Sequence, residues 1–125
     1  MWRVSRNYLN TLRDEIYKNA VEKGWWDEER TFGDVISLCH SELSEALEEY
    51  RGDNKLLYYV DDVGNPSDVP TNTHTKPEGI AIEFADVIIR ILDYCGHRGI
   101  DIAEAIAIKN AYNKIRPYRH GGKRM

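Results

Sequence analysis

The chain has 125 residues, of which 42% are hydrophobic and 30% charged, and its formal net charge is −4. This length predicts a single domain, residues 1–125, and the acidic balance argues against stable nucleic-acid binding. No secretion signal and no apolar run long enough to span a bilayer are recognisable, so we expect a cytoplasmic protein without a membrane partner. Cys39 and Cys95 lie on apolar helix faces without CxxC spacing, which predicts buried, reduced thiols.

Apolar residues recur at helical spacing through most of the chain and predict four helices. The first is expected over residues 4–23 and ends at Gly24, a residue that suits a helix C-terminus. The second follows the N-cap Thr31 and runs to residue 51, before Gly52. Capping residues therefore set the expected limits of both helices.

An insert and two further helices are predicted in the second half of the chain. Residues 53–76 begin with an apolar run and continue with a polar, Pro/Gly/Asn-rich stretch, which predicts a long loop or a small hairpin. Pro77 is expected to be the first residue of the third helix, which ends near residues 96–99. Asp101 is typical of a cap for the fourth helix, and Pro117 ends that helix. The predicted fold class is all-α, a four-helix bundle completed by oligomerisation.

Two short carboxylate pairs lie inside these helices, Glu42-x-x-Glu45 and Glu83-x-x-Asp86. Because side chains three residues apart share a helix face, each pair points in one direction. Glu42 falls within the apolar stripe of its helix, where an uncompensated charge is costly. Facing carboxylates would also repel one another, and a hard divalent cation relieves both costs. The alternative is a solvated helix face, above all for the second pair, which belongs to a wider polar arc.

Two further groups are candidates for contact with an anionic substrate. Lys109, Asn113 and Arg116 have i, i+4, i+7 spacing, so they share one face at the end of the fourth helix. Such a row suits a polyphosphate, and a solvated helix end is the alternative. Trp25 and Trp26 are adjacent in the turn after the first helix, where an indole can stack on a base or fill the core. We expect one of the two tryptophans to pack in the core and the other, Trp26, to face the substrate.

In their order along residues 24–118, these motifs resemble the all-α nucleotide pyrophosphohydrolases of the MazG-like superfamily. The resemblance implies a Mg²⁺ site, with Mn²⁺ as an alternative ion, held by Glu42, Glu45, Glu83 and Asp86. It also implies that Lys109, Asn113 and Arg116 contact phosphates. Ser41 stands where the family often has an additional Glu. The general base is therefore assigned to Glu45, with Glu49 as the alternative.

The resemblance implies Mg²⁺-dependent hydrolysis of nucleoside or deoxynucleoside triphosphates at the α-phosphorus, which gives a monophosphate and pyrophosphate in nucleotide-pool housekeeping. It also implies a homodimer or homotetramer, and the wide apolar helix faces indicate the same. The basic tail, residues 116–125, is expected to reach a partner's phosphates or to be disordered. Two other functions stay open: a phosphoribosyl-ATP pyrophosphohydrolase, and a non-catalytic helical dimer that binds a partner.

Overall fold

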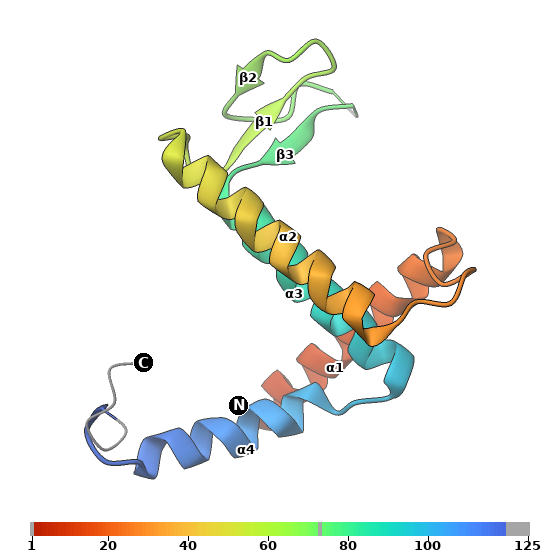
Figure 1. Cartoon of the computed structure of the whole chain (residues 1–125), viewed down its shortest axis with the longest axis vertical. Coiled ribbons are helices and arrows are strands. Elements are labelled where there is room, and N and C mark those ends of the chain that lie inside the picture. Colours follow the sequence, from red (N-terminus) through yellow and green to blue (C-terminus); the bar gives the residue numbers. More distant parts are fainter. Residues whose placement is uncertain (1, 73, 120–125) are drawn as a thin grey trace.

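The computed structural model describes residues 2–72 and 74–119, with side chains from residue 8 onward. Four helices make up most of it: α1 (Trp2–Glu22), α2 (Phe32–Arg51), α3 (Ile80–Arg98) and α4 (Ile102–Ile115). Between α2 and α3 lies a small antiparallel sheet of β1 (Tyr58–Val60), β2 (Pro66–Ser67) and β3 (Lys76–Glu78), in the order β2-β1-β3 (Figure 1). In this described part, no helix combines the length and apolarity needed to cross a membrane. Most of the basic tail, residues 120–125, lies outside the described residues.

Capping residues fix the helix ends as the sequence predicts. The Thr31 hydroxyl accepts a hydrogen bond from the Asp34 backbone N–H at 3.1 Å, and the Asp34 carboxylate accepts one from the Thr31 N–H at 3.0 Å. The Asp101 carboxylate likewise accepts a hydrogen bond from the backbone N–H of Glu104. These contacts satisfy backbone donors that a helix leaves unpaired in its first turn. The predicted limits of the first, second and fourth helices are confirmed to within about two residues.

The predicted start of the third helix at Pro77 is wrong. Pro77 lies in β3 opposite Tyr59, and α3 begins three residues later, at Ile80. An edge strand tolerates proline, and the pairing of β3 with β1 holds this segment extended. Gly79 makes the turn into α3 at φ 114°, and a Cβ there would lie 2.3 Å from the carbonyl oxygen of Leu56. The insert is therefore a three-stranded sheet packed closely against the start of α3.

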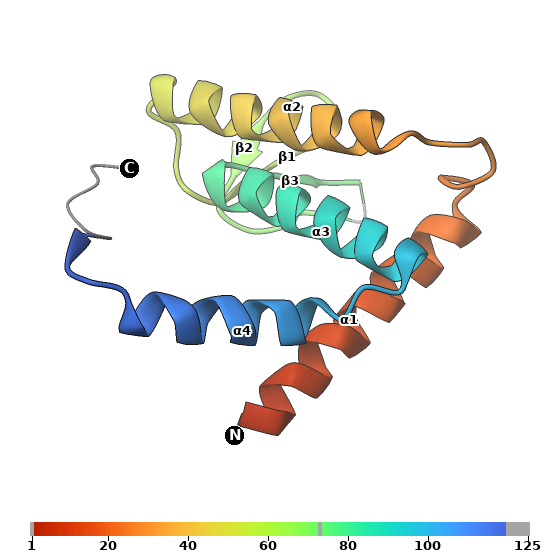
Figure 2. The same ribbon diagram turned by 60° about the horizontal axis from the view of Figure 1, so that its bottom comes forward.

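The helices pack as successive pairs, α2 on α3, α3 on α1 and α1 on α4 (Figures 1 and 2). Few apolar side chains are buried: Val35, Cys39, Ala46, Leu92, Cys95 and Ala103. Both cysteines are thus buried, as predicted. The chain exposes 9671 Å², whereas a compact monomer of 14.5 kDa exposes about 6,900 Å². One chain therefore forms an open bundle whose core it does not fill.

Candidate metal centre

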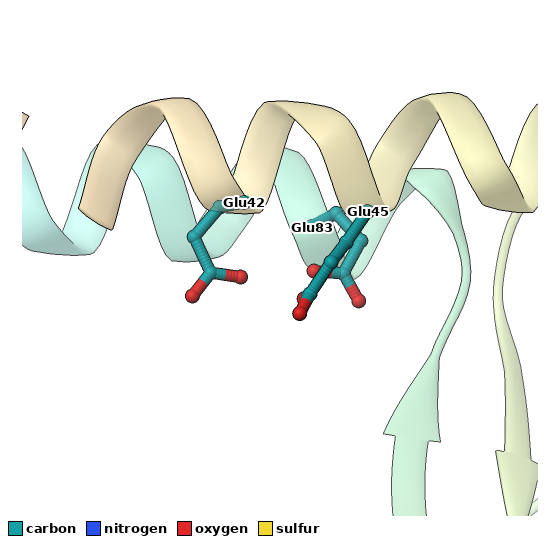
Figure 3. Close-up of side chains that lie close together, drawn as sticks. All are labelled: Glu42, Glu45 and Glu83. Carbon is teal, nitrogen blue, oxygen red and sulfur yellow. The ribbon is translucent and has the colours of Figure 1, made fainter. Parts of the chain in front are cut away.

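Three carboxylates from two helices meet between α2 and α3. Glu42 and Glu45 of α2 and Glu83 of α3 each offer an oxygen, and these oxygens lie within 4.8 Å of one another. Figure 3 shows the three side chains directed to the same side of the helix pair. The i,i+3 spacing places the first two one turn apart, and the packing of α3 on α2 places the third opposite them. The structure thus brings together carboxylates from both predicted pairs.

Burial makes this cluster costly without a compensating charge. Glu42 and Glu83 are each only 8% exposed, while Glu45 is exposed. Glu83 Oε2 is the only buried side-chain oxygen or nitrogen in the described region that lacks a hydrogen-bond partner. A buried carboxylate oxygen in this state requires a proton or a cation. The cluster therefore has the donor set and the unmet charge of a metal site.

A cavity of about 410 Å³ opens beside the cluster. The half-buried Asp86, one turn along α3 from Glu83, lines it together with the three glutamates. Its remaining wall comes from Ile82 of α3, from the end of α2 and from β3, where Lys76 and Glu78 lie. The fourth predicted carboxylate thus borders the same space, although the group within 4.8 Å consists of the three glutamates.

The electrostatics of the cluster favour cation binding. Burial raises the pKa of Glu83, and the nearby carboxylates of Glu45 and Glu42 raise it further, to about 8. Burial also disfavours the charged form of Glu42, but hydrogen bonds from Arg90 and Glu83 outweigh this effect and lower its pKa. Burial and the negative charge of Glu42 raise the pKa of Asp86. At neutral pH the metal-free cluster therefore holds a proton on Glu83, which a metal ion would displace.

Arg90 belongs to the site although no role was predicted for it. Its Nη2 and Nε donate hydrogen bonds to Glu42 Oε1 at 2.9 and 3.2 Å. The guanidinium also lies 5.1 Å from the ring centroid of Trp25. Arg90 follows Asp86 by four residues and Glu83 by seven, so spacing alone placed it on their face of α3. The sequence therefore showed that Arg90 shares a helix face with these carboxylates. It did not show that Arg90 would pair with Glu42 on another helix.

The two tryptophans have different surroundings. Trp26 Nε1 donates a hydrogen bond to Asp93 Oδ1 at 2.9 Å, and its ring stacks on His97 with 3.9 Å between centroids. Trp25 instead lines a cavity of about 420 Å³ between α1 and α3, which Asp86 also lines. Base contact by Trp26 stays a prediction, and Trp25 is the indole that shares a cavity with Asp86.

The predicted phosphate-binding row lies on α4 and at its C-cap, Arg116, and the packing partner of α4 in the chain is α1. Lys109 Nζ and the Arg116 guanidinium lie 4.9 and 5.4 Å from the ring centroid of Tyr112. Lys109, Asn113 and Arg116 are not among the residues that line the carboxylate cavity. Both ribbon views show α4 diverging from the α2–α3 pair (Figures 1 and 2). Within one chain, the structure therefore does not bring this row to the carboxylates.

Fold and cluster together define a mainly helical protein with an acidic site that could hold a metal ion. Comparison of the chain with protein-family models, with curated proteins and with solved structures finds no match. The function therefore has to be inferred from the site and from the spacing of the motifs.

Proposed function

We propose that this chain is a magnesium-dependent nucleoside triphosphate pyrophosphohydrolase of the MazG-like class. The observation that carries the proposal is the cluster of Glu42, Glu45 and Glu83, with its buried and unpartnered Glu83 oxygen. Arg90 supplies a single positive charge to these carboxylates, through Glu42. A set of carboxylate oxygens without sulfur or imidazole suits Mg²⁺, and Mn²⁺ accepts the same donors.

The reaction proposed for this site is water attack at the α-phosphorus. Glu42, Glu45 and Glu83, with Asp86, would hold the metal ion. When bound, the ion would neutralise phosphate oxygens and the charge that develops on them during attack. Glu45, the exposed member of the cluster, would accept a proton from the attacking water. The new bond joins the water oxygen to the α-phosphorus, and the bond to the pyrophosphate oxygen breaks.

The nucleoside is proposed to occupy the cavity between α1 and α3. Asp86 lines both this cavity and the carboxylate cavity, so the two spaces adjoin. Trp25, whose ring already has the Arg30 guanidinium 3.8 Å from its centroid, would contribute aromatic surface to the base site, and the amide of Asn19 in the same lining can hydrogen-bond a base edge. A volume of about 420 Å³ lies within the range of small-molecule sites.

The proposed enzyme is a homodimer or homotetramer. Apolar residues are exposed at helical spacing on α2 and α3, on a side of the pair that the carboxylates do not occupy: Leu43, Leu47, Tyr50, Phe84, Ile88 and Ile91. The accessible surface exceeds that of a compact monomer by about 2,800 Å², which is ample for an obligate interface. A second copy would cover this face. In such an assembly, Lys109, Asn113 and Arg116 of one copy could reach the site of another.

The test is pyrophosphate release from a panel of canonical and modified nucleoside triphosphates and phosphoribosyl-ATP, with magnesium and with chelator. We expect magnesium-dependent release that Glu45→Gln lowers by at least about a hundredfold. Glu22→Gln is the matched control, because Glu22 is exposed at the end of α1 and does not line either cavity. Folded protein that releases no pyrophosphate from any compound would refute the proposal. Release from phosphoribosyl-ATP alone would select that alternative.

A further inference from the structure

The small sheet between α2 and α3 is fixed to the rim of the carboxylate cavity. The Tyr58 hydroxyl on β1 donates hydrogen bonds to both carboxylate oxygens of Glu49 on α2, at 2.8 and 3.1 Å. At the same end of the sheet, the backbone N–H of Ala81 in the first turn of α3 donates a hydrogen bond to the carbonyl oxygen of Leu56, just before β1, at 3.1 Å. Contacts to both helices therefore hold the sheet in place beside the site.

The strand β3 borders the carboxylate cavity. In the β1–β3 pair, Tyr58 lies opposite Glu78 and Val60 lies opposite Lys76. Tyr58 contacts α2 through Glu49, which lines the cavity, and Lys76, Pro77 and Glu78 of β3 line it as well. Alternate residues of one strand share a face, so Lys76 and Glu78 lie on the same face of the sheet. Pairing with β1 therefore holds Lys76 in the lining of the cavity.

Lys76 is the only cationic residue in a strongly acidic lining. Among the described residues, seven carboxylates line this cavity: Glu42, Glu45, Glu48, Glu49, Glu78, Glu83 and Asp86. The Lys76 side chain is 79% exposed, and its Nζ lies 3.7 Å from Glu78 Oε1. A contact of this length at an exposed site holds the ammonium weakly. Lys76 can therefore turn toward an anion that enters the cavity with a metal ion.

We propose that Lys76 is a phosphate-binding residue of this site, and that its ligand class is a metal-bound polyphosphate. An ammonium on a flexible stem binds phosphate oxygens as a point charge with three donors. The inference rests on the proposed function and deepens it, because it supplies the phosphate-binding cation from the same chain as the carboxylates. Within that chain the predicted cations of α4 do not line this cavity.

Thermal unfolding of the full chain with inorganic tripolyphosphate tests this role without requiring turnover. Melting temperatures are compared with magnesium alone and with magnesium plus tripolyphosphate at constant free magnesium, for wild type, Lys76→Met and Lys76→Arg. Lys55→Met is the matched control: Lys55 belongs to the same insert and is 68% exposed, but it pairs with Asp68 and lines a different cavity.

We expect Lys76→Met to keep the stabilisation by magnesium and to lose most of the further stabilisation by tripolyphosphate. Its KM for nucleoside triphosphates should rise about tenfold, and Lys76→Arg should recover most of both effects. Lys55→Met should behave as wild type.

The inference is overturned if the Lys76→Met variant gains as much stability from tripolyphosphate as the Lys55→Met variant does. It is also overturned if the wild-type protein gains no stability from tripolyphosphate. The proposed function fails separately, if tripolyphosphate binds in a Lys76-dependent manner but no compound of the panel releases pyrophosphate.

Discussion

The α2–α3 pair and α4 both carry polar residues in rows at helical spacing, but only the rows on α2 and α3 converge within the chain. Glu42 of α2 and Glu83 of α3 face each other because these two helices pack together. Lys109 on α4 and Arg116 at its C-cap lie around Tyr112, and the helix packs on α1. Spacing along one helix defines a face, but a site forms only where two faces meet. The carboxylate rows therefore make a site in one chain, whereas the α4 row would need another copy.

Neutralising the carboxylates should have the largest effect of the substitutions on turnover. Glu42→Gln, Glu45→Gln, Glu83→Gln and Asp86→Asn should each lower turnover by at least about a hundredfold, because each removes a negative charge that holds the metal ion. Steady-state kinetics, with circular dichroism to confirm the helical fold, measures this. At neutral pH, Glu83→Gln should leave the metal-free protein at least as stable as wild type, because a neutral amide replaces a carboxyl group that is already protonated. Near-normal turnover in two of the four variants would refute the metal assignment.

The tryptophan pair offers a second comparison of the same kind, between two adjacent residues. Trp26→Ala should lower the free energy of unfolding by about 2 kcal/mol, because the hydrogen bond to Asp93 and the stacking on His97 are lost. Trp25→Ala should have a smaller effect on stability and should raise KM by about tenfold through loss of base stacking. Chemical denaturation and kinetics on two nucleotides measure both. If KM rises in Trp26→Ala and not in Trp25→Ala, then Trp26 is the substrate-facing tryptophan, as the sequence predicts.

Substitutions of Lys109 and Arg116 test whether the predicted phosphate-binding row contributes to substrate binding. Lys109→Ala and Arg116→Ala should raise KM by about five- to tenfold and leave magnesium stabilisation without nucleotide unchanged. If the row acts on the site of another copy, a mixture of Glu83→Gln and Arg116→Ala subunits should recover activity above either variant alone. Loss of magnesium stabilisation in the α4 variants would show that their roles are misassigned.

The smallest expected effect is the pH dependence of stability. Because the pKa of Glu83 is raised to about 8 in the folded chain, the folded state binds more protons than the unfolded state between about pH 4.5 and 8. Stability of the metal-free protein should therefore fall by a few degrees in melting temperature as pH rises through this window, and the raised pKa of Asp86 acts in the same direction. Magnesium stabilisation should grow over the same window, since the ion displaces the proton.

Calorimetry from pH 6 to 9, with and without magnesium, measures this dependence. Glu83→Gln is the control, because it removes the titrating group and should flatten most of the dependence. Equal magnesium stabilisation at pH 6 and pH 9 would contradict the proton assignment.

The helices, and the faces on which the carboxylates lie, follow from local patterns in the sequence. Thr31 and Asp101 cap their helices through hydrogen bonds within three residues, so local chemistry sets these ends. The burial of Glu42 likewise follows from its place in the apolar stripe of α2. Such features depend on residues within one or two helical turns, which a single sequence displays.

Packing between distant segments of the chain determines which of these faces meet. Arg90 neutralises Glu42 across 48 positions of sequence, and no local pattern encodes such a contact. Pairing with β1 holds Pro77 in a strand, although its position in the sequence favoured a helix start, and the same pairing holds Lys76 in the lining of the cavity. Contacts between distant segments depend on how whole elements pack, and many packings satisfy the same helical pattern. The site therefore combines side chains placed by local spacing with partners supplied by the fold.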